Sequence, residues 1–137
     1  GPKLSGVLAG LVFAATAADA LAQETIDCGY PLNENERSFC ADKALKDATG
    51  RMQQAYDRLL ARVVELDKAL PEHLQGSPEA LENAQAAWKT YADKDCGAYS
   101  FPFRGGTRGN DLYRNCLIVL TMKRTEDLDA TLQDYSN

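Results

Sequence analysis

Apolar residues recur at steps of three and four between residues 48 and 70, which is the spacing of one face of an α-helix. The stripe consists of Ala48, Met52, Ala55, Tyr56, Leu59, Leu60, Val63, Leu66 and Leu70. Asn33, followed three residues later by Glu36, forms a capping-box pattern that predicts the start of this helix. Pro71 predicts its end, and Gly50 allows a local bend within it. The sequence therefore predicts a long first helix.

Two further amphipathic stretches follow. Ser77 with Pro78 and Glu79 is typical of a helix start, with a capping serine, a proline in the first turn and an acid near the positive helix end. The expected inward face of this second helix consists of Ala80, Leu81, Ala84, Trp88, Tyr91 and Asp95. Asn110 is predicted to cap a last helix that runs to about Leu132, with an inward face of Tyr113, Cys116, Leu117, Leu120, Arg124 and Leu128.

Because no stretch alternates like a strand, we predict an all-α fold, an antiparallel three-helix bundle with a long first helix. Trp88 and Tyr56 are expected to be structural side chains of its core. Asp95 and Arg124 both fall on expected inward faces. Since a buried charge needs a partner, we predict that they form an ion pair between the second and third helices.

The chain has four cysteines, Cys28, Cys40, Cys96 and Cys116. The start of the chain, described next, predicts export, and an even number of cysteines in an exported protein indicates two disulfides. Three pairings are possible. We favour the local one, Cys28 with Cys40 and Cys96 with Cys116, because each pair brackets turn residues. A zinc site is disfavoured, since no C-x-x-C pair occurs and His73 is the single histidine. No metal or cofactor is expected.

The first residues have the pattern of a secretory signal peptide. Lys3 precedes an apolar run that is shorter than the ~20 residues of a bilayer span, and Ala20-Leu21-Ala22 resembles a cleavage site. We interpret residues 1–23 as a signal peptide preceded by a Gly-Pro tag remnant, and residues 24–137 as a single helical domain. Cys28 is not preceded by a lipobox. We therefore expect a periplasmic or secreted protein without membrane insertion.

The net charge is −5, and it does not change on removal of residues 1–23, which hold one charge of each sign. Acidity disfavours nucleic acid and anionic membranes as partners and permits a basic protein partner. No G-x-S-x-G or H-E-x-x-H pattern is present, and His73 has no nucleophile pattern near it. We therefore expect a binding protein without catalytic residues, and a monomer.

The stretch from Gly97 to Gly109 is predicted to be a loop, rich in aromatic residues and glycine and held between two cysteines. Aromatic and arginine side chains are those that most often dominate protein interfaces. The candidate partner-binding residues are Phe101, Phe103, Arg104, Gly105, Gly106, Thr107 and Arg108. In the alternative interpretation the phenylalanines fold back over the end of the bundle and the glycines only turn the chain.

Several of these features occur together in a known family. They are Cys40, the Leu59 region after Tyr56, the Ala84-Gln85-Ala86-Ala87-Trp88 stretch, Cys96, Gly105-Gly106-Thr107, Cys116 and the Thr121-x-x-Arg124-x-x-x-Leu128 pattern. From about Cys28 to Leu132 the chain resembles the lysozyme inhibitor LprI-like family. It departs from the family at Gln53, where asparagine is usual, and in lacking the lipobox of the family's named member.

The resemblance implies a helical secreted domain that inhibits a lysozyme. Glycosidases of this class cut with two carboxylates in a cleft, so Arg104, Thr107 or Arg108 could enter the cleft, bind those carboxylates and exclude substrate. The alternative is a structural or binding protein of the bacterial envelope, or one that binds a host protein or a glycan, in which this loop only shapes the fold.

Overall fold

The computed structural model describes residues 1–2, 6, 9–10 and 26–136. The chain divides into two units, Gly1–Arg37 and Ser38–Asn137, which are described separately. The predicted signal peptide at residues 1–23 falls mainly outside the described residues. This segment and the domain boundary at residue 24 therefore stay predictions.

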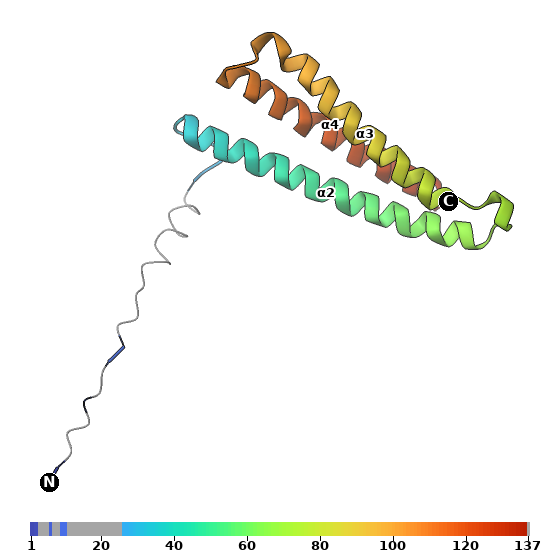
Figure 1. The fold of residues 1–137 in the computed structure, drawn as a ribbon, viewed down its shortest axis with the longest axis horizontal. Helices are drawn as coiled ribbons and strands as arrows, with labels where there is room; N and C mark the ends of the chain where they lie inside the picture. The colour runs from blue at the N-terminus through green and yellow to red at the C-terminus, as the bar shows by residue number, and fades with distance from the viewer. Residues whose placement is uncertain (3–5, 7–8, 11–25, 137) are drawn as a thin grey trace. The chain divides into compact units, whose positions relative to one another are not determined.

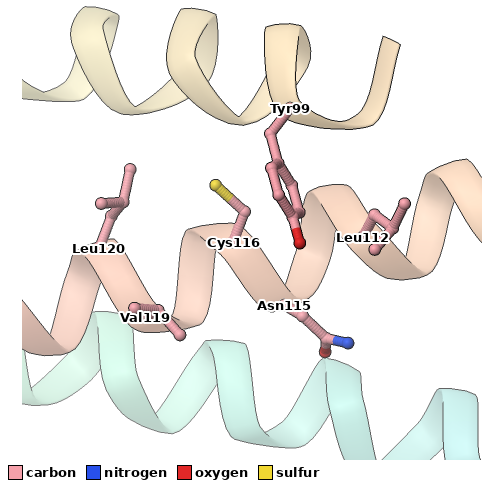
Figure 2. Close-up of a pocket in the computed structure, with 6 residues that line it drawn as sticks. All are labelled: Tyr99, Leu112, Asn115, Cys116, Val119 and Leu120. Atoms are coloured by element: carbon pink, nitrogen blue, oxygen red, sulfur yellow. The ribbon is translucent and has the colours of Figure 1, made fainter. Parts of the chain in front are cut away.

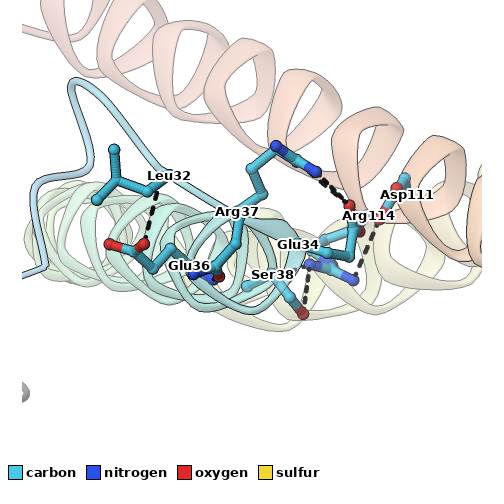
Figure 3. A network of polar contacts seen from close by, with 8 residues as sticks. Leu32, Glu34, Glu36, Arg37, Ser38, Asp111 and Arg114 are labelled. Carbon is cyan, nitrogen blue, oxygen red and sulfur yellow. Dashed lines mark hydrogen bonds and ion pairs between the residues drawn. The ribbon is translucent and has the colours of Figure 1, made fainter.

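The first unit ends in a capped helix start. Oδ1 of Asn33 accepts a hydrogen bond of 2.9 Å from the backbone N–H of Glu36. The Glu36 carboxylate accepts one of 3.3 Å from the N–H of Leu32, and Figure 3 shows this second bond. The first bond satisfies an N–H group that the first turn of a helix leaves without a backbone partner, and the second ties the preceding residue to the helix. Asn33 thus caps the helix as predicted.

The helices are α2 (Glu34–Lys68), α3 (Ser77–Ser100) and α4 (Thr107–Asp134), with 3-10 turns η1 (Glu72–Leu74) and η2 (Phe101–Phe103) between them. In the second unit the three helices lie beside one another and alternate in direction (Figure 1). The part of the chain that the structure describes contains no strand. The predicted all-α antiparallel bundle with a long first helix is confirmed.

Asp67 closes the connection between α2 and α3. Its carboxylate accepts hydrogen bonds from the N–H groups of Gly76, at 2.9 Å, and Ser77, at 3.3 Å. The prediction that the Ser77 hydroxyl caps α3 is wrong, since the N-cap residue is Gly76, which has no side chain, and Ser77 is the first residue of the helix. A carboxylate from the preceding helix fills this role, which suits the positive end of the α3 dipole.

The core lies where the central and later turns of α2 meet the second half of α4. Its fully buried cluster is Met52, Ala55, Leu59, Val63 and Leu128. Tyr56 and Trp88, the two expected structural aromatics, are partly buried and pack against this cluster. Leu70 is 40% exposed, because α2 ends at Lys68 and leaves the leucine in the turn that follows. The apolar stripe thus forms the core up to Val63, but not to its predicted end.

The inward face of α3 is rotated from the predicted one. Its buried residues are Gln85, Ala92, Cys96 and Ser100. Tyr91 is 57% exposed and Asp95 is exposed as well, although both were predicted to face inward. The rotation follows from two contacts with α4 that an apolar pattern does not reveal, a disulfide at Cys96 and a hydrogen bond at Gln85.

Cys96 of α3 and Cys116 of α4 form a disulfide, with their Cα atoms 5.5 Å apart. Cys28 and Cys40 are disulfide-bonded as well, and none of the cysteines is free. Both predicted bridges are confirmed. The Cys96–Cys116 bond holds α3 against α4 near the η2 turn, away from the apolar core cluster.

Within the described residues, no helix combines the length and the apolar character that a membrane span needs.

Candidate functional site

The segment that joins α3 to α4 is shorter than the sequence predicts. Residues 97–100 continue α3, and Thr107 begins α4, so only residues 101–106 connect the helices. Asn110, the predicted cap, lies inside α4. The hydroxyl of buried Ser100 donates to the Cys96 carbonyl at 2.9 Å, so this polar group is satisfied within the extended helix. We call residues 101–108 the Phe-Arg loop, although Thr107 and Arg108 belong to the first turn of α4.

Each phenylalanine of the Phe-Arg loop stacks with one arginine. The Arg104 guanidinium lies 4.0 Å from the ring centroid of Phe101, and the Arg108 guanidinium lies 4.0 Å from that of Phe103. Phe101 is 58% exposed and Phe103 is 40% exposed, so neither ring is buried against the end of the bundle. The cation–π contacts order both pairs of side chains at the surface.

The two guanidinium groups keep most of their donors for a partner. Nη1 of Arg104 donates to the Phe101 carbonyl at 3.0 Å. Among the described residues, neither Arg104 nor Arg108 forms an ion pair with a carboxylate. An arginine without an internal carboxylate partner can bind a carboxylate or phosphate of another molecule in a bidentate way. The loop therefore presents two positive charges, each beside an aromatic ring.

Two glycines hold the Phe-Arg loop in place. Gly105 has a φ of 86°, a conformation that favours glycine. Gly109 is buried in the first turns of α4, where a Cβ atom would lie 2.3 Å from the carbonyl oxygen of Phe103. The loop backbone therefore rests directly on the α4 backbone. Gly109 was predicted to be the last residue of a loop, and this contact was not predicted, because no sequence signal distinguishes such a glycine from an ordinary loop glycine.

Arg114, which no sequence pattern singled out, connects α4 to α2 about two helical turns after the Phe-Arg loop. Its side chain is only 16% exposed, and it lies 3.4 Å from the Asp42 carboxylate and 3.6 Å from that of Asp111. It also donates to the Ser38 carbonyl at 3.2 Å (Figure 3). This largely buried charge has several acceptors around it, so it joins the helices at the end of the second unit that carries the loop.

A hydrogen bond from Tyr113 to Asp93 joins α4 to α3 in the same region. This bond, together with partial desolvation and the charge of Asp93, raises the pKa of the Tyr113 hydroxyl above its ordinary value. The neutral phenol is the donor, so the bond exists only while Tyr113 is protonated.

The residues of the A-Q-x-x-W and T-x-x-R-x-x-x-L patterns have structural roles. Nε of Arg124 donates to Oε1 of Gln85 at 2.9 Å, and Gln85 is 5% exposed. The predicted ion pair of Arg124 with Asp95 is not formed, because Asp95 faces outward and a buried amide accepts the arginine N–H group. Leu128 belongs to the core cluster, and Trp88 packs against that cluster. These patterns therefore specify how α3 and α4 pack.

A pocket of about 330 Å³ opens beside the Cys96–Cys116 bridge. It is lined by Tyr99 of α3 and by Leu112, Asn115, Cys116, Val119 and Leu120 of α4 (Figure 2). Asn115 supplies an amide, and the other residues present mainly carbon and sulfur. In Figure 2 the Tyr99 side chain reaches down from α3 toward the α4 residues. No sequence pattern predicts this pocket, because its walls come from two helices.

The described residues contain no group of three or more histidine, cysteine, aspartate or glutamate side chains placed to hold a metal ion. His73 lies in η1, in the connection between α2 and α3. The side chains that form the two Phe–Arg stacks and the pocket are mainly aromatic, aliphatic and cationic, which suits binding of another molecule.

The family model described as "Lysozyme inhibitor LprI" matches residues 29–128. An uncharacterized protein of Rhizobium meliloti (strain 1021) is 31% identical over 130 residues, which cover 93% of this chain and 94% of the relative. No solved structure matches the chain. The matched region contains the whole of α2 and α3, and α4 up to residue 128. The chain belongs to the lysozyme inhibitor LprI family.

Proposed function

We propose that this protein is exported and inhibits a lysozyme by placing the Phe-Arg loop in the active-site cleft of the enzyme. Family membership supports the choice of a lysozyme as the partner. The observation that carries the choice of the loop is the pair of exposed Phe–Arg stacks, whose guanidinium groups have no carboxylate partner among the described residues. A family described by inhibition also fits a protein without catalytic residues of its own.

The chemistry of the cleft matches the chemistry of the loop. Glycosidases of this class hold two carboxyl groups on either side of the scissile bond. Arg104 or Arg108 could form bidentate hydrogen bonds with an ionised carboxylate, while the rings of Phe101 and Phe103 exclude water from the contact. Thr107 adds a hydroxyl beside them. A lysozyme with its carboxylates bound in this way cannot admit substrate.

The order of the free loop favours binding. The Cys96–Cys116 bridge and the contact of Gly109 with Phe103 fix the loop backbone before a partner arrives. A preordered loop loses less conformational entropy on binding than a flexible one. The net charge of −5 would speed association with a basic lysozyme, with a rate that falls as salt is added.

The test is clearance of bacterial cell-wall suspensions by c-type, g-type and i-type lysozymes, with and without a several-fold molar excess of the oxidised protein. We expect protection against at least one type. The variant with Arg104→Ala and Arg108→Ala should inhibit that lysozyme at least about 30-fold less well, since an interface arginine that dominates binding contributes about 2 kcal/mol or more.

Arg51→Ala is the matched control. Arg51 is exposed on α2 and, like the loop arginines, has no ion pair within the described residues, so its removal should leave inhibition unchanged. Both variants make the protein more acidic, which favours a basic lysozyme, so a loss of inhibition must come from a lost contact. Equal losses in both variants would therefore count against the loop as the site of that contact. Unimpaired clearance by all three lysozymes would contradict the proposal and favour a different protein or glycan partner.

A further inference from the structure

We propose that the pocket beside the Cys96–Cys116 bridge receives a large apolar side chain of the same lysozyme whose carboxylates bind the Phe-Arg loop. The inference rests on the proposed function and deepens it, because it names a second contact and the kind of residue that the partner supplies. The inhibited enzyme would carry an exposed aromatic or aliphatic side chain at the rim of its cleft, a short distance from the catalytic carboxylates.

The pocket lies close to the Phe-Arg loop along α4. The backbone of Phe103 rests on Gly109 in the first turns of α4. Leu112 and Cys116 follow Gly109 at steps of three and four, so the three residues share one face of the helix. Each such step is about one helical turn of 5.4 Å, which places the pocket within reach of the partner that contacts the loop. On the opposite wall of the pocket, Tyr99 of α3 lies only two residues before Phe101 of the loop.

The lining predicts the chemistry of the occupant. Asn115 has an amide, and no side chain of the pocket is charged, so an apolar group fits better than an ion. Tyr99 is 60% exposed and Val119 is 49% exposed, which leaves apolar surface open to water in the free protein. The volume of about 330 Å³ lies near the low end of the ~300–1,000 Å³ typical of ligand sites and is ample for one large side chain.

The pocket is also held in shape before binding. Cys116 forms part of its wall and is bonded to Cys96, so the two helices cannot separate at this point. A preformed pocket that takes one apolar residue beside arginine–carboxylate contacts has the composition of an interface hot spot. The apolar contact would exclude water next to the arginine–carboxylate contact. Exclusion of water lowers the local dielectric constant and so strengthens the attraction between the guanidinium group and the carboxylate.

The experiment compares two substitutions on the same helix by isothermal titration calorimetry, with the lysozyme that the oxidised protein inhibits. Val119→Gln makes the pocket polar, whereas Met122→Gln changes a residue of α4 with the same exposure of 49% that does not line it. Because both side chains are half exposed, both variants should keep their fold, which circular dichroism verifies. Tyr99→Ser, on α3, removes the opposite wall and serves as an independent variant.

We expect Val119→Gln and Tyr99→Ser each to weaken binding about tenfold or more, and Met122→Gln to change it less than about twofold. If all three variants bind like the wild-type protein while the double arginine variant does not, the pocket inference is wrong and the proposed function survives. If the wild-type protein binds no lysozyme, the proposed function and this inference fail together. Equal weakening by Val119→Gln and Met122→Gln would also overturn the inference.

Discussion

Replacing Gly109 by alanine should destabilise the protein, although the same change in most helices stabilises them. Alanine is favoured over glycine in a helix interior by about 1 kcal/mol. At Gly109, however, the new Cβ would lie 2.3 Å from the Phe103 carbonyl oxygen and 2.8 Å from its carbonyl carbon, where ordinary contact begins at 3.4 Å. These are backbone atoms, so a side-chain rotation cannot relieve the overlap, and η2 must move by about 1 Å.

Forcing extra volume into a close-packed contact typically costs about 1–3 kcal/mol, which outweighs the gain in helix propensity. We therefore expect Gly109→Ala to lower the free energy of unfolding by about 1–2 kcal/mol. The measurement is urea unfolding followed by circular dichroism at 222 nm, compared at equal m-values. Displacement of η2 should also reduce lysozyme inhibition.

Gly50→Ala is the matched control for this prediction. Gly50 lies inside α2, is exposed, and has no atom within 4 Å of the position that a Cβ would take. The substitution should raise stability by up to about 1 kcal/mol. The two variants thus make the same chemical change with opposite expected signs. If Gly109→Ala stabilises the protein as Gly50→Ala does, the close contact between loop and helix does not exist.

Three further perturbations test other contacts. Changing Cys96 and Cys116 together to serine should lower the free energy of unfolding by about 3 kcal/mol, and a urea titration without reductant would measure it. Arg124→Ala leaves a buried glutamine oxygen without its donor and should lower the free energy of unfolding by about 1–3 kcal/mol. Asp95→Ala should change it by less than about 0.5 kcal/mol, and a larger effect of Asp95→Ala than of Arg124→Ala would support the ion pair predicted from the sequence. The pKa of Tyr113 is raised above its unfolded value of about 10 by the hydrogen bond to a carboxylate, so its contribution is fully present below pH 10 and is lost as pH rises through the folded pKa. Unfolding midpoints between pH 9 and 12 should therefore fall less for Tyr113→Phe than for the wild-type protein.

The sequence predicts the helices well where the signals are local. The stripe from Ala48 to Val63 and the cap at Asn33 depend on residues a few positions apart, and both are found in the structure. The pairing of Cys96 with Cys116 also follows from closeness in sequence. These features do not depend on how the helices are rotated against one another.

The apolar pattern did not specify how each helix is rotated about its own axis. The apolar pattern predicts Tyr91 on the inward face and does not include Gln85 there. In the structure Tyr91 is 57% exposed, whereas Gln85 is buried and accepts a hydrogen bond from Arg124 across the helix interface. The extent of the loop was overestimated for a related reason. Gly97 and Gly109 bounded the predicted loop. In the structure Gly97 lies inside α3, and Gly109 lies in α4, where the close approach of the Phe103 carbonyl group requires a glycine.

The candidate site was predicted in part. Its residues were selected from their types, aromatic and arginine, and the structure adds that Phe101 stacks with Arg104 and Phe103 with Arg108. The pocket lined by Tyr99 and Val119 was missed, since residues 20 positions apart meet there only through the α3–α4 packing.

The most direct test of the central claim is competition between this protein and a chitooligosaccharide for the inhibited lysozyme. If the Phe-Arg loop occupies the active-site cleft, a saturating trisaccharide of N-acetylglucosamine should raise the apparent Kd of the complex in proportion to its concentration. The same titration with Arg51→Ala should give an identical dependence. A lysozyme that binds the oligosaccharide and this protein at once, with neither affinity changed, would contradict occupation of the cleft.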